Sequence, residues 1–296
     1  MLSADDFVPV TLDDRTFFKQ HYAKYPQTHS DNTFTNMVCW NHFAHYRYAV
    51  VNGSVILSST IDAKTRFRPP IGPRDPDLCK TLIQLAFHEG DEEPVVLIDP
   101  DTCSWIRSIC PNLSIVSDRN TFEYVYKARD LADLSGGNYL SMRRQLNKFK
   151  RKCAYSVESI TAENREEVKY FLIKWCEWKG CEGEPVLAHE KDAIFYAVDH
   201  YIDLGISGLL IRVDDNIGAI SLFEPLNADT ALVHFEKGLP DCEGIYKAIN
   251  SETASVLSHD FTYINRESDL GIPGLRESKM RYHPHHMVEV YSIKRQ

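Results

Sequence analysis

Three consecutive β-strand patterns in the second half of the chain limit its possible folds more than any other feature. They lie at 208–213, 217–223 and 230–236, and turn-forming residues separate them. The turn from Asp214 to Asn216 is short enough to join the first two strands as an antiparallel pair. Helical patterns precede the three strands, and a helix, a strand, a short helix and a last strand follow them. We therefore expect an α+β fold with a mixed, mostly antiparallel sheet flanked by helices.

The first half of the chain shows a weaker version of this order. A hairpin is expected at 46–58, where Asn52 and Gly53 supply the positive φ angles of a tight turn. A helix at 77–88 and a buried strand at 94–98 follow it. The order of elements in the two halves is similar to that of GNAT-type acyltransferases (acyl-CoA N-acyltransferases). That similarity implies two tandem GNAT-like domains.

The segment 130–138 marks the expected domain boundary, because it contains Ser-Gly-Gly and separates the two similar orders of elements. We therefore predict an N-terminal domain of residues 1–134 and a C-terminal domain of residues 135–296 that carries the functional site. The length of 296 residues is that of two ordinary domains.

The chain shows no segment that suggests a membrane or an export signal. No stretch approaches the roughly 20 apolar residues that cross a bilayer, and the first residues lack the basic start and apolar core of a signal peptide. We therefore expect a cytoplasmic protein without stable membrane insertion. Without a secretion signal, the eight cysteines are expected to be free and mostly buried thiols.

Two groups of residues contain side chains of the types that bind metal ions. Cys176 and Cys181 precede His189, but structural zinc sites normally show tighter paired spacing. The histidines at 283, 285 and 286 surround Pro284, which favours a turn into the last strand. We therefore predict no metal site and no cofactor.

One helix carries a concentrated positive charge, although the whole chain has a formal net charge of −9. The overall charge argues against nucleic-acid binding by the entire surface. Between Arg143 and Lys152, however, there are six basic residues and no acidic one. This face either binds a polyanion or is simply solvated. The candidate polyanion-binding residues are Arg143, Arg144, Lys148 and Arg151.

Three stretches of the sequence, at 139–151, 229–237 and 263–284, resemble the catalytic domain of phosphatidylglycerol lysyltransferases. Fem-type aminoacyltransferases share that architecture. The resemblance implies a tandem GNAT-like fold and transfer of an aminoacyl group from aminoacyl-tRNA. The membrane-embedded half of the lysyltransferases has no counterpart in these residues, so a lipid head group and a small amine both stay open as acceptors. The oligomeric state is left unassigned.

The loop at 239–246 argues against coenzyme A as the donor. In a GNAT fold the donor lies where the fourth and fifth strands part, and coenzyme A enzymes usually place several glycines there to wrap the pyrophosphate. This loop has one glycine and carries the acidic residues Asp241 and Glu243. We expect weak coenzyme A binding. Acyl-CoA N-acyltransfer and a non-catalytic, ligand-binding or partner-binding double-GNAT protein remain the alternatives.

The candidate reacting groups are expected near the ends of two parallel neighbouring strands, with Tyr282 on a later segment that crosses close to these ends. Glu236 would accept a proton from the acceptor, Lys237 would hold a phosphate or an oxyanion, and Tyr282 would protonate the leaving oxygen. We expect these side chains to converge with those that hold the donor. The alternative is a network of salt bridges that only locks the loop. The proposed donor-binding residues are Arg266, Glu267, Arg276 and Lys279.

Overall fold

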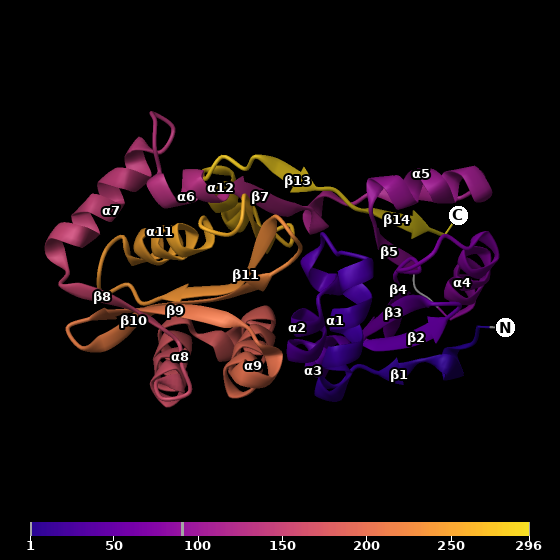
Figure 1. The fold of residues 1–296 in the computed structure, drawn as a ribbon, viewed down its shortest axis with the longest axis horizontal. Helices are drawn as coiled ribbons and strands as arrows, with labels where there is room; N and C mark the ends of the chain where they lie inside the picture. The colour runs from indigo at the N-terminus through magenta and orange to yellow at the C-terminus, as the bar shows by residue number, and fades with distance from the viewer. Residues whose placement is uncertain (1, 90–91, 296) are drawn as a thin grey trace. The chain divides into compact units, whose positions relative to one another are not determined.

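The computed structural model describes residues 2–89 and 92–295 and divides the chain into two compact units (Figure 1). Unit 1 contains Met1–Glu123, Ser268–Ile272 and Met287–Gln296, and unit 2 contains Tyr124–Glu267 and Pro273–His286. Each unit holds a seven-stranded mixed sheet flanked by helices. This architecture confirms the expected α+β fold with two GNAT-like domains.

Unit 1 is built on a sheet with the strand order β1-β2-β3-β4-β5-β14-β6. Among its described strands, β4 and β5 are the one parallel pair, joined at Phe67 and Val95, and the other neighbours are antiparallel. Its strands are β1 (Val8–Pro9), β2 (Arg47–Val51), β3 (Ser54–Ile61), β4 (Lys64–Phe67), β5 (Val95–Ile98), β6 (Ser114–Ser117) and β14 (Tyr291–Lys294). Its helices are α1 (Arg15–Lys24), α2 (Phe34–Cys39), α3 (Asn41–Ala44), α4 (Pro76–Glu89) and α5 (Pro100–Ile109), with short 3₁₀ turns at η1 (Ala4–Asp6), η2 (Leu12–Asp14), η3 (Ser30–Asn32) and η4 (Arg119–Thr121).

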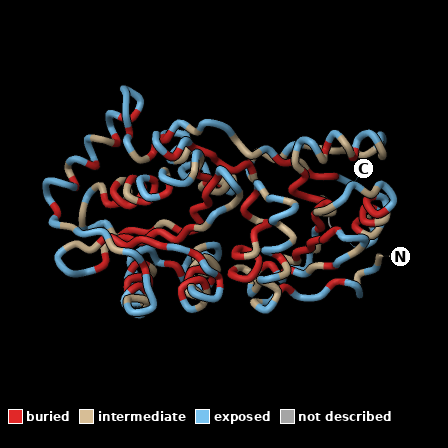
Figure 2. The backbone as a smooth tube through the Cα atoms, in the orientation of Figure 1, coloured by how far each residue is buried: buried red, intermediate tan, exposed pale blue. Residues whose placement is uncertain are grey.

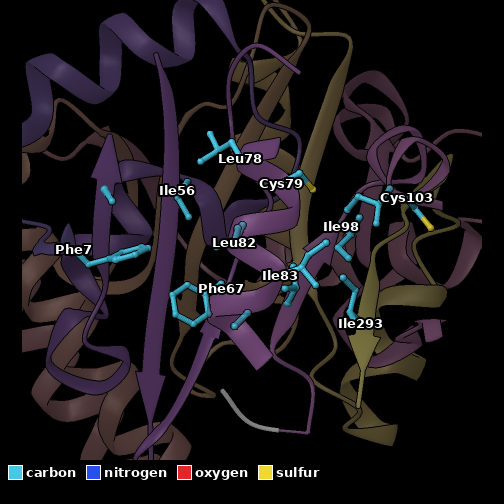
Figure 3. Packing of buried hydrophobic residues seen from close by; sticks show 14 residues of the cluster. Phe7, Ile56, Phe67, Leu78, Cys79, Leu82, Ile83, Ile98, Cys103 and Ile293 are labelled. Atoms are coloured by element: carbon cyan, nitrogen blue, oxygen red, sulfur yellow. The ribbon is translucent and has the colours of Figure 1, made fainter. Parts of the chain in front are cut away.

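The core of unit 1 forms between α4 and the sheet. Apolar side chains recur along α4 at spacings of three and four, so they share one face of the helix. Figure 3 shows this face directed toward Ile56 and Phe67 of the sheet. Ile293, from the C-terminal strand, is fully buried in the same cluster. The labelled members on α4 are Leu78, Cys79, Leu82 and Ile83.

Unit 2 is built on a sheet with the strand order β13-β7-β12-β11-β10-β9-β8. In Figure 1, α11 lies over one face of this sheet, and α8 and α9 lie on the other. The middle strands β10 and β11 are buried along most of their length (Figure 2). Its strands are β7 (Glu123–Lys127), β8 (Tyr155–Ser159), β9 (Ser207–Val213), β10 (Asn216–Pro225), β11 (Thr230–Gly238), β12 (Tyr263–Ser268) and β13 (His286–Val288). Its helices are α6 (Ala128–Asp133), α7 (Leu140–Lys152), α8 (Arg165–Lys179), α9 (Pro185–Asp199), α10 (Tyr201–Leu204), α11 (Ile245–Leu257) and α12 (Pro273–Met280).

The two halves of the sequence exchange strands between the sheets. β7, which precedes the expected boundary, pairs with β12 in unit 2, and the C-terminal β14 pairs with β5 and β6 in unit 1. The units therefore divide the chain at 123/124, whereas we expected 134/135, and the C-terminal segment does not stay with the second half. Strand patterns identify strands but carry no information about which distant strand is the partner.

Four of the eight cysteines form disulfides, so the expectation of free thiols is wrong for these four. Cys153 pairs with Cys242, and Cys176 pairs with Cys181. The second pair forms because α8 ends at Gly180 in the left-handed conformation, which turns the chain back toward the last helical turn.

No helix in the described part of the chain is both long enough and apolar enough to span a membrane.

The strand exchange predicts that β14 is essential for the stability of unit 1. Replacing Ile293 by alanine should lower the free energy of unfolding by about 2–5 kcal/mol, because its buried side chain leaves a cavity in the core. Chemical denaturation measures this difference. The adjacent Lys294→Ala should cost less than about 1 kcal/mol, because that side chain is 49% exposed and forms only a surface ion pair with Glu93. Equal effects of the two changes would contradict the placement of β14.

Candidate active site

The candidate site forms where β11 and β12 part. The two strands run parallel and pair at three positions only, the last of which joins Leu232 and Asn265. Both strands continue beyond this point, β11 to Gly238 and β12 to Ser268. In open sheets that contain parallel strands, such separation of neighbouring strand ends exposes backbone groups and side chains to a ligand. The candidate residues on β11 and β12 therefore lie close together, beyond the last paired positions of the two strands.

A β-bulge in β11 decides which side chains face which side of the sheet. Leu222 of β10 is opposite Phe235, and the next residue, Phe223, is opposite Val233, so His234 is an extra residue. Glu236 then lies on the face covered by α11, and Lys237 lies on the face covered by α8 and α9. The strand end therefore presents two separate polar clusters.

The cluster on the α11 face joins Glu236, Arg266 and Tyr282. Nη2 of Arg266 lies 2.9 Å from Oε1 of Glu236, and the guanidinium lies 4.9 Å from the centroid of the Tyr282 ring. Burial lowers the pKa of Arg266, but Glu236, Tyr282 and Tyr126 together outweigh this and leave the pKa raised. The Tyr282 side chain is almost fully buried. These three groups form one connected polar network across the parted strands.

Two residues of α11 complete this network, and the sequence did not indicate either. Nζ of Lys247 donates to the Tyr282 hydroxyl at 2.9 Å and lies 4.6 Å from the centroid of the same ring. Nδ2 of Asn250 donates to Oε2 of Glu236 at 3.4 Å. Because Lys247 and Asn250 are three residues apart on a helix, both point to the same side.

Lys279 reaches the cluster through the backbone of β12. Its Nζ donates to the carbonyl oxygen of Arg266 and, at 3.3 Å, to that of Glu267. The Tyr126 hydroxyl donates to the carbonyl oxygen of Lys279 at 2.9 Å, and this bond ties α12 to β7. The structure thus brings together Glu236, Arg266, Lys279 and Tyr282, as the sequence predicted. Arg276 also lies on α12, half-buried.

Lys237 is not part of this cluster. Its Nζ forms a 2.7 Å ion pair with Glu190 of α9 and lies 4.5 Å from the ring centroid of Trp175 in α8. Adjacent residues on a strand point to opposite faces of a sheet, so Glu236 and Lys237 cannot act on the same atom. The expectation that they form one reacting centre is therefore corrected.

Glu267 and Arg266 lie on opposite faces of the sheet. Glu267 belongs to a triad with the buried His234 and with Glu224. Nε2 of His234 lies 2.9 Å from Oε1 of Glu224, and Nδ1 lies 3.5 Å from Oε1 of Glu267. Burial alone lowers the pKa of His234, but the bonds to these two carboxylates raise it to about 9. This triad bridges β10, β11 and β12 on one face, while Glu236 and Arg266 bridge β11 and β12 on the other.

The segment before α11 is held against α7. Cys242 is bonded to Cys153, and Glu243 is paired with Lys148. Gly244 has a φ of 96°, and a Cβ atom added there would lie 2.6 Å from the carbonyl oxygen of Gln145. Only glycine allows this approach. The N-terminus of α11 therefore abuts the backbone of α7.

The four basic residues proposed on α7 differ in their surroundings. The Arg143 guanidinium donates to the backbone carbonyl oxygens of Leu134 and Gly136, and Lys148 pairs with Glu243. Arg144 and Arg151 are exposed. Since these two are seven residues apart, they lie on the same side of the helix and are the members best placed to meet a ligand.

The His234 triad predicts a specific dependence of stability on pH. The folded-state pKa of about 9 exceeds the ordinary value of 6.5, so protonated His234 stabilises the fold fully below pH 6.5, and this stabilisation is lost as pH rises through about 9. The loss should be at most about 3 kcal/mol. Urea denaturation between pH 6 and pH 9.5 measures it.

A matched substitution separates this effect from other titrating groups. The stability difference between the wild type and His234→Asn should shrink as pH rises through this range, whereas the exposed His259→Asn should track the wild type throughout. A difference for His234→Asn that does not change with pH would show that the ring is not held protonated.

The sequence and the fold of this chain are both similar to those of known proteins. The family model "Phosphatidylglycerol lysyltransferase, C-terminal" matches residues 22–294. A conserved protein of unknown function from Bacteroides thetaiotaomicron has a crystal structure that is similar to this chain, with 27% identity and a TM-score of 0.90 over 98% of this chain and 99% of that one. An uncharacterised protein of Mycoplasmoides gallisepticum is 24% identical over 241 residues, which cover 78% of this chain and 75% of that protein.

A second solved structure has a similar fold. The structure of L-PGS from Bacillus licheniformis is similar with a TM-score of 0.65 and 13% identity, over 94% of this chain and 91% of that one. At this identity the likeness concerns the fold. The family match, by contrast, covers nearly the whole sequence. The chain belongs to the family of phosphatidylglycerol lysyltransferase C-terminal domains.

Proposed function

We propose that this protein transfers an aminoacyl group from an aminoacyl-tRNA to an amine or hydroxyl acceptor. Two observations support the proposal. The chain belongs to a family whose name describes lysyl transfer to phosphatidylglycerol. The observation that carries it is the network in which the Tyr282 hydroxyl contacts Lys247 beside the ion pair of Arg266 and Glu236. This network combines a hydroxyl group, two cations and a carboxylate at the parted strand ends.

The proposed reaction exchanges one ester bond for a new amide or ester bond. The acceptor atom attacks the carbonyl carbon of the aminoacyl ester, and the bond from that carbon to the terminal ribose oxygen of the tRNA breaks. Glu236 takes the proton that the acceptor loses, and Tyr282 gives a proton to the ribose oxygen. Return of the proton from Glu236 to Tyr282 restores the site, so no proton is gained or lost overall.

The two cations stabilise the negative charge that develops during this exchange. Lys247 lies 2.9 Å from the Tyr282 hydroxyl, so its charge favours the phenolate that forms when the proton leaves. Arg266 is fixed by Glu236 and faces the same ring. Preorganised charges in a site with little water are worth more than the same charges in bulk solvent.

The contact between α7 and α11 disfavours coenzyme A as the donor. A helix N-terminus is a natural site for a pyrophosphate, because its free N–H groups point outward. Here the N-terminus of α11 meets the carbonyl oxygen of Gln145, and Glu243 adds negative charge next to it. This arrangement supports an aminoacyl ester, whose reacting part carries no pyrophosphate.

The acceptor that the family name indicates is the head group of phosphatidylglycerol, which offers a hydroxyl group. A small amine would use the same chemistry. Arg144 and Arg151 on α7 supply exposed positive charge for the phosphates of the tRNA.

Transfer of radiolabelled amino acid from a charged tRNA mixture to phosphatidylglycerol vesicles, or to a mixture of small amines, tests the function. Tyr282→Phe should lower kcat at least about 100-fold, because it removes only the proton donor. Tyr139→Phe is the matched control. Its hydroxyl donates to the backbone carbonyl oxygen of Tyr282 at 3.0 Å and takes no part in the proposed chemistry, so kcat should fall less than about threefold.

The outcomes distinguish the alternatives. Equal activity of Tyr282→Phe and the wild type would remove Tyr282 from the chemistry. Transfer with acetyl-CoA as donor and none with charged tRNA would favour acyl-CoA N-acyltransfer. Binding of charged tRNA without transfer to any acceptor would favour the non-catalytic, ligand-binding alternative.

The basic face of α7 predicts how tRNA binding depends on salt. Arg144→Gln combined with Arg151→Gln should weaken binding and reduce the slope of log K against log salt by about 1.5, since two phosphate contacts are lost. Filter binding at several salt concentrations measures the slope. Lys174→Gln with Lys179→Gln removes the same charge from exposed positions on α8 and should leave the slope unchanged. Equal slopes in all three proteins would contradict a tRNA contact at α7.

A further inference from the structure

Unit 1 contains a buried arginine, Arg68, whose charge is not balanced at close range by a carboxylate of the described residues. The residue follows β4 directly and is 3% exposed. Its backbone N–H donates to the carbonyl oxygen of Leu57 at 2.9 Å, so the residue is fixed beside β3. Within residues 2–89 and 92–295, no carboxylate oxygen lies within 4 Å of the guanidinium. Burying an unpaired charge costs several kcal/mol, so such residues normally face a partner.

The protein contacts one terminal nitrogen and the face of the guanidinium. Nη1 donates to the Ser59 hydroxyl at 2.6 Å, and the guanidinium carbon lies 5.4 Å from the centroid of the Tyr46 ring. Nε is buried and has no hydrogen-bond partner in the described part of the chain. Nε and Nη2 form the edge of arginine that binds a carboxylate or a phosphate through two parallel hydrogen bonds. The unused donor is therefore on the edge suited to an oxyanion.

A second buried donor lies near the first. The hydroxyl of Tyr22, on α1, is fully buried and has no partner among the described residues. Burial raises the pKa of Tyr22, and the charge of Arg68 acts in the opposite direction, as expected for neighbouring groups. A buried hydroxyl without a partner also costs free energy. The Arg68 Nε and the Tyr22 hydroxyl are both unsatisfied donors, and the first is cationic. A negatively charged acceptor would satisfy both.

The nearby carboxylate of Glu123 has its own donors. Its oxygens accept from the backbone N–H of Ser30 at 3.0 and 3.1 Å and from the Ser30 hydroxyl, and Nδ1 of His29 lies 3.4 Å from Oε1. Burial lowers the pKa of His29, but Glu123, Asp31 and the backbone of Thr121 together outweigh this and raise it. Glu123 and His29 therefore form a pair of their own and do not complete the surroundings of Arg68.

We propose that unit 1 binds a small oxyanion, the carboxylate or phosphate group of a ligand, between Arg68 and Tyr22. The Nε–Nη2 edge of Arg68 holds two oxygens, and the Tyr22 hydroxyl donates to one of them. This site belongs to unit 1 and uses none of the residues of the proposed aminoacyl transfer, so it stands or falls independently of that proposal.

Thermal unfolding of the intact protein in inorganic phosphate and in acetate, each compared with sodium chloride at equal ionic strength, tests the site. The unfolding temperature should rise saturably with at least one of the two anions. A rise with phosphate alone assigns a phosphate group, and a rise with acetate alone assigns a carboxylate. No rise above the chloride reference with either anion would contradict the site.

Substitutions connect the binding to the two donors. Arg68→Gln should weaken anion binding at least about tenfold, whereas Arg66→Gln removes the same charge from an exposed position of β4 and should have no effect. Tyr22→Phe removes only the unsatisfied hydroxyl. It should leave the unfolding temperature without anion unchanged or higher and weaken anion binding about fivefold.

If Arg68→Gln does not fold, Tyr22→Phe by itself tests the proposed oxyanion site. Tyr25→Phe is its control, because this tyrosine lies at the end of the same helix and is only partly buried. Anion affinity that is unchanged in Tyr22→Phe, or unchanged in a folded Arg68→Gln protein, would overturn the proposal.

Discussion

The parting of β11 and β12 is the constraint on which the rest of unit 2 depends. After Leu232 and Asn265 the two parallel strands stop exchanging backbone hydrogen bonds, yet both continue. Charged side chains bridge them instead, Glu236 with Arg266 on one face and His234 with Glu267 on the other. Side-chain bridges can be opened without breaking the sheet, so the same feature stabilises the strand ends and offers reactive groups to a ligand.

The bulge at His234 gives each bridge its own face. Regular alternation would place His234 and Glu236 on one side of the sheet, where the two bridges would interfere with each other. The extra residue separates them, and it also moves Lys237 to the side of Trp175 and Glu190. A bulge is not visible in an apolar pattern. The joint role expected for Glu236 and Lys237 fails for a simpler reason, because adjacent residues of a strand point to opposite faces of the sheet.

Sequence patterns predicted what depends on local order. The α+β class, the run of three strands and the meeting of Glu236, Arg266, Lys279 and Tyr282 follow from periodicity and from the rule that parallel neighbours end at one edge. Features that depend on contacts between segments far apart in the sequence were not predicted. The exchange of β7 and β14, the bond between Cys153 and Cys242, and the contact of Lys247 with Tyr282 each join segments whose pairing no local pattern specifies. Lys247 and Asn250 are polar residues three apart on one helix, but α11 carries other polar residues as well, so this spacing does not single them out.

A crystal structure with a donor analogue, an aminoacyl adenosine in which an amide replaces the ester, tests the central claim most directly. The proposed aminoacyl transfer predicts that the aminoacyl carbonyl group lies between the ends of β11 and β12, with the ribose-side atom of the amide within hydrogen-bonding distance of the Tyr282 hydroxyl. An analogue bound on the α8 and α9 face, or bound elsewhere with the network of Glu236, Arg266, Lys247 and Tyr282 still closed, would contradict it.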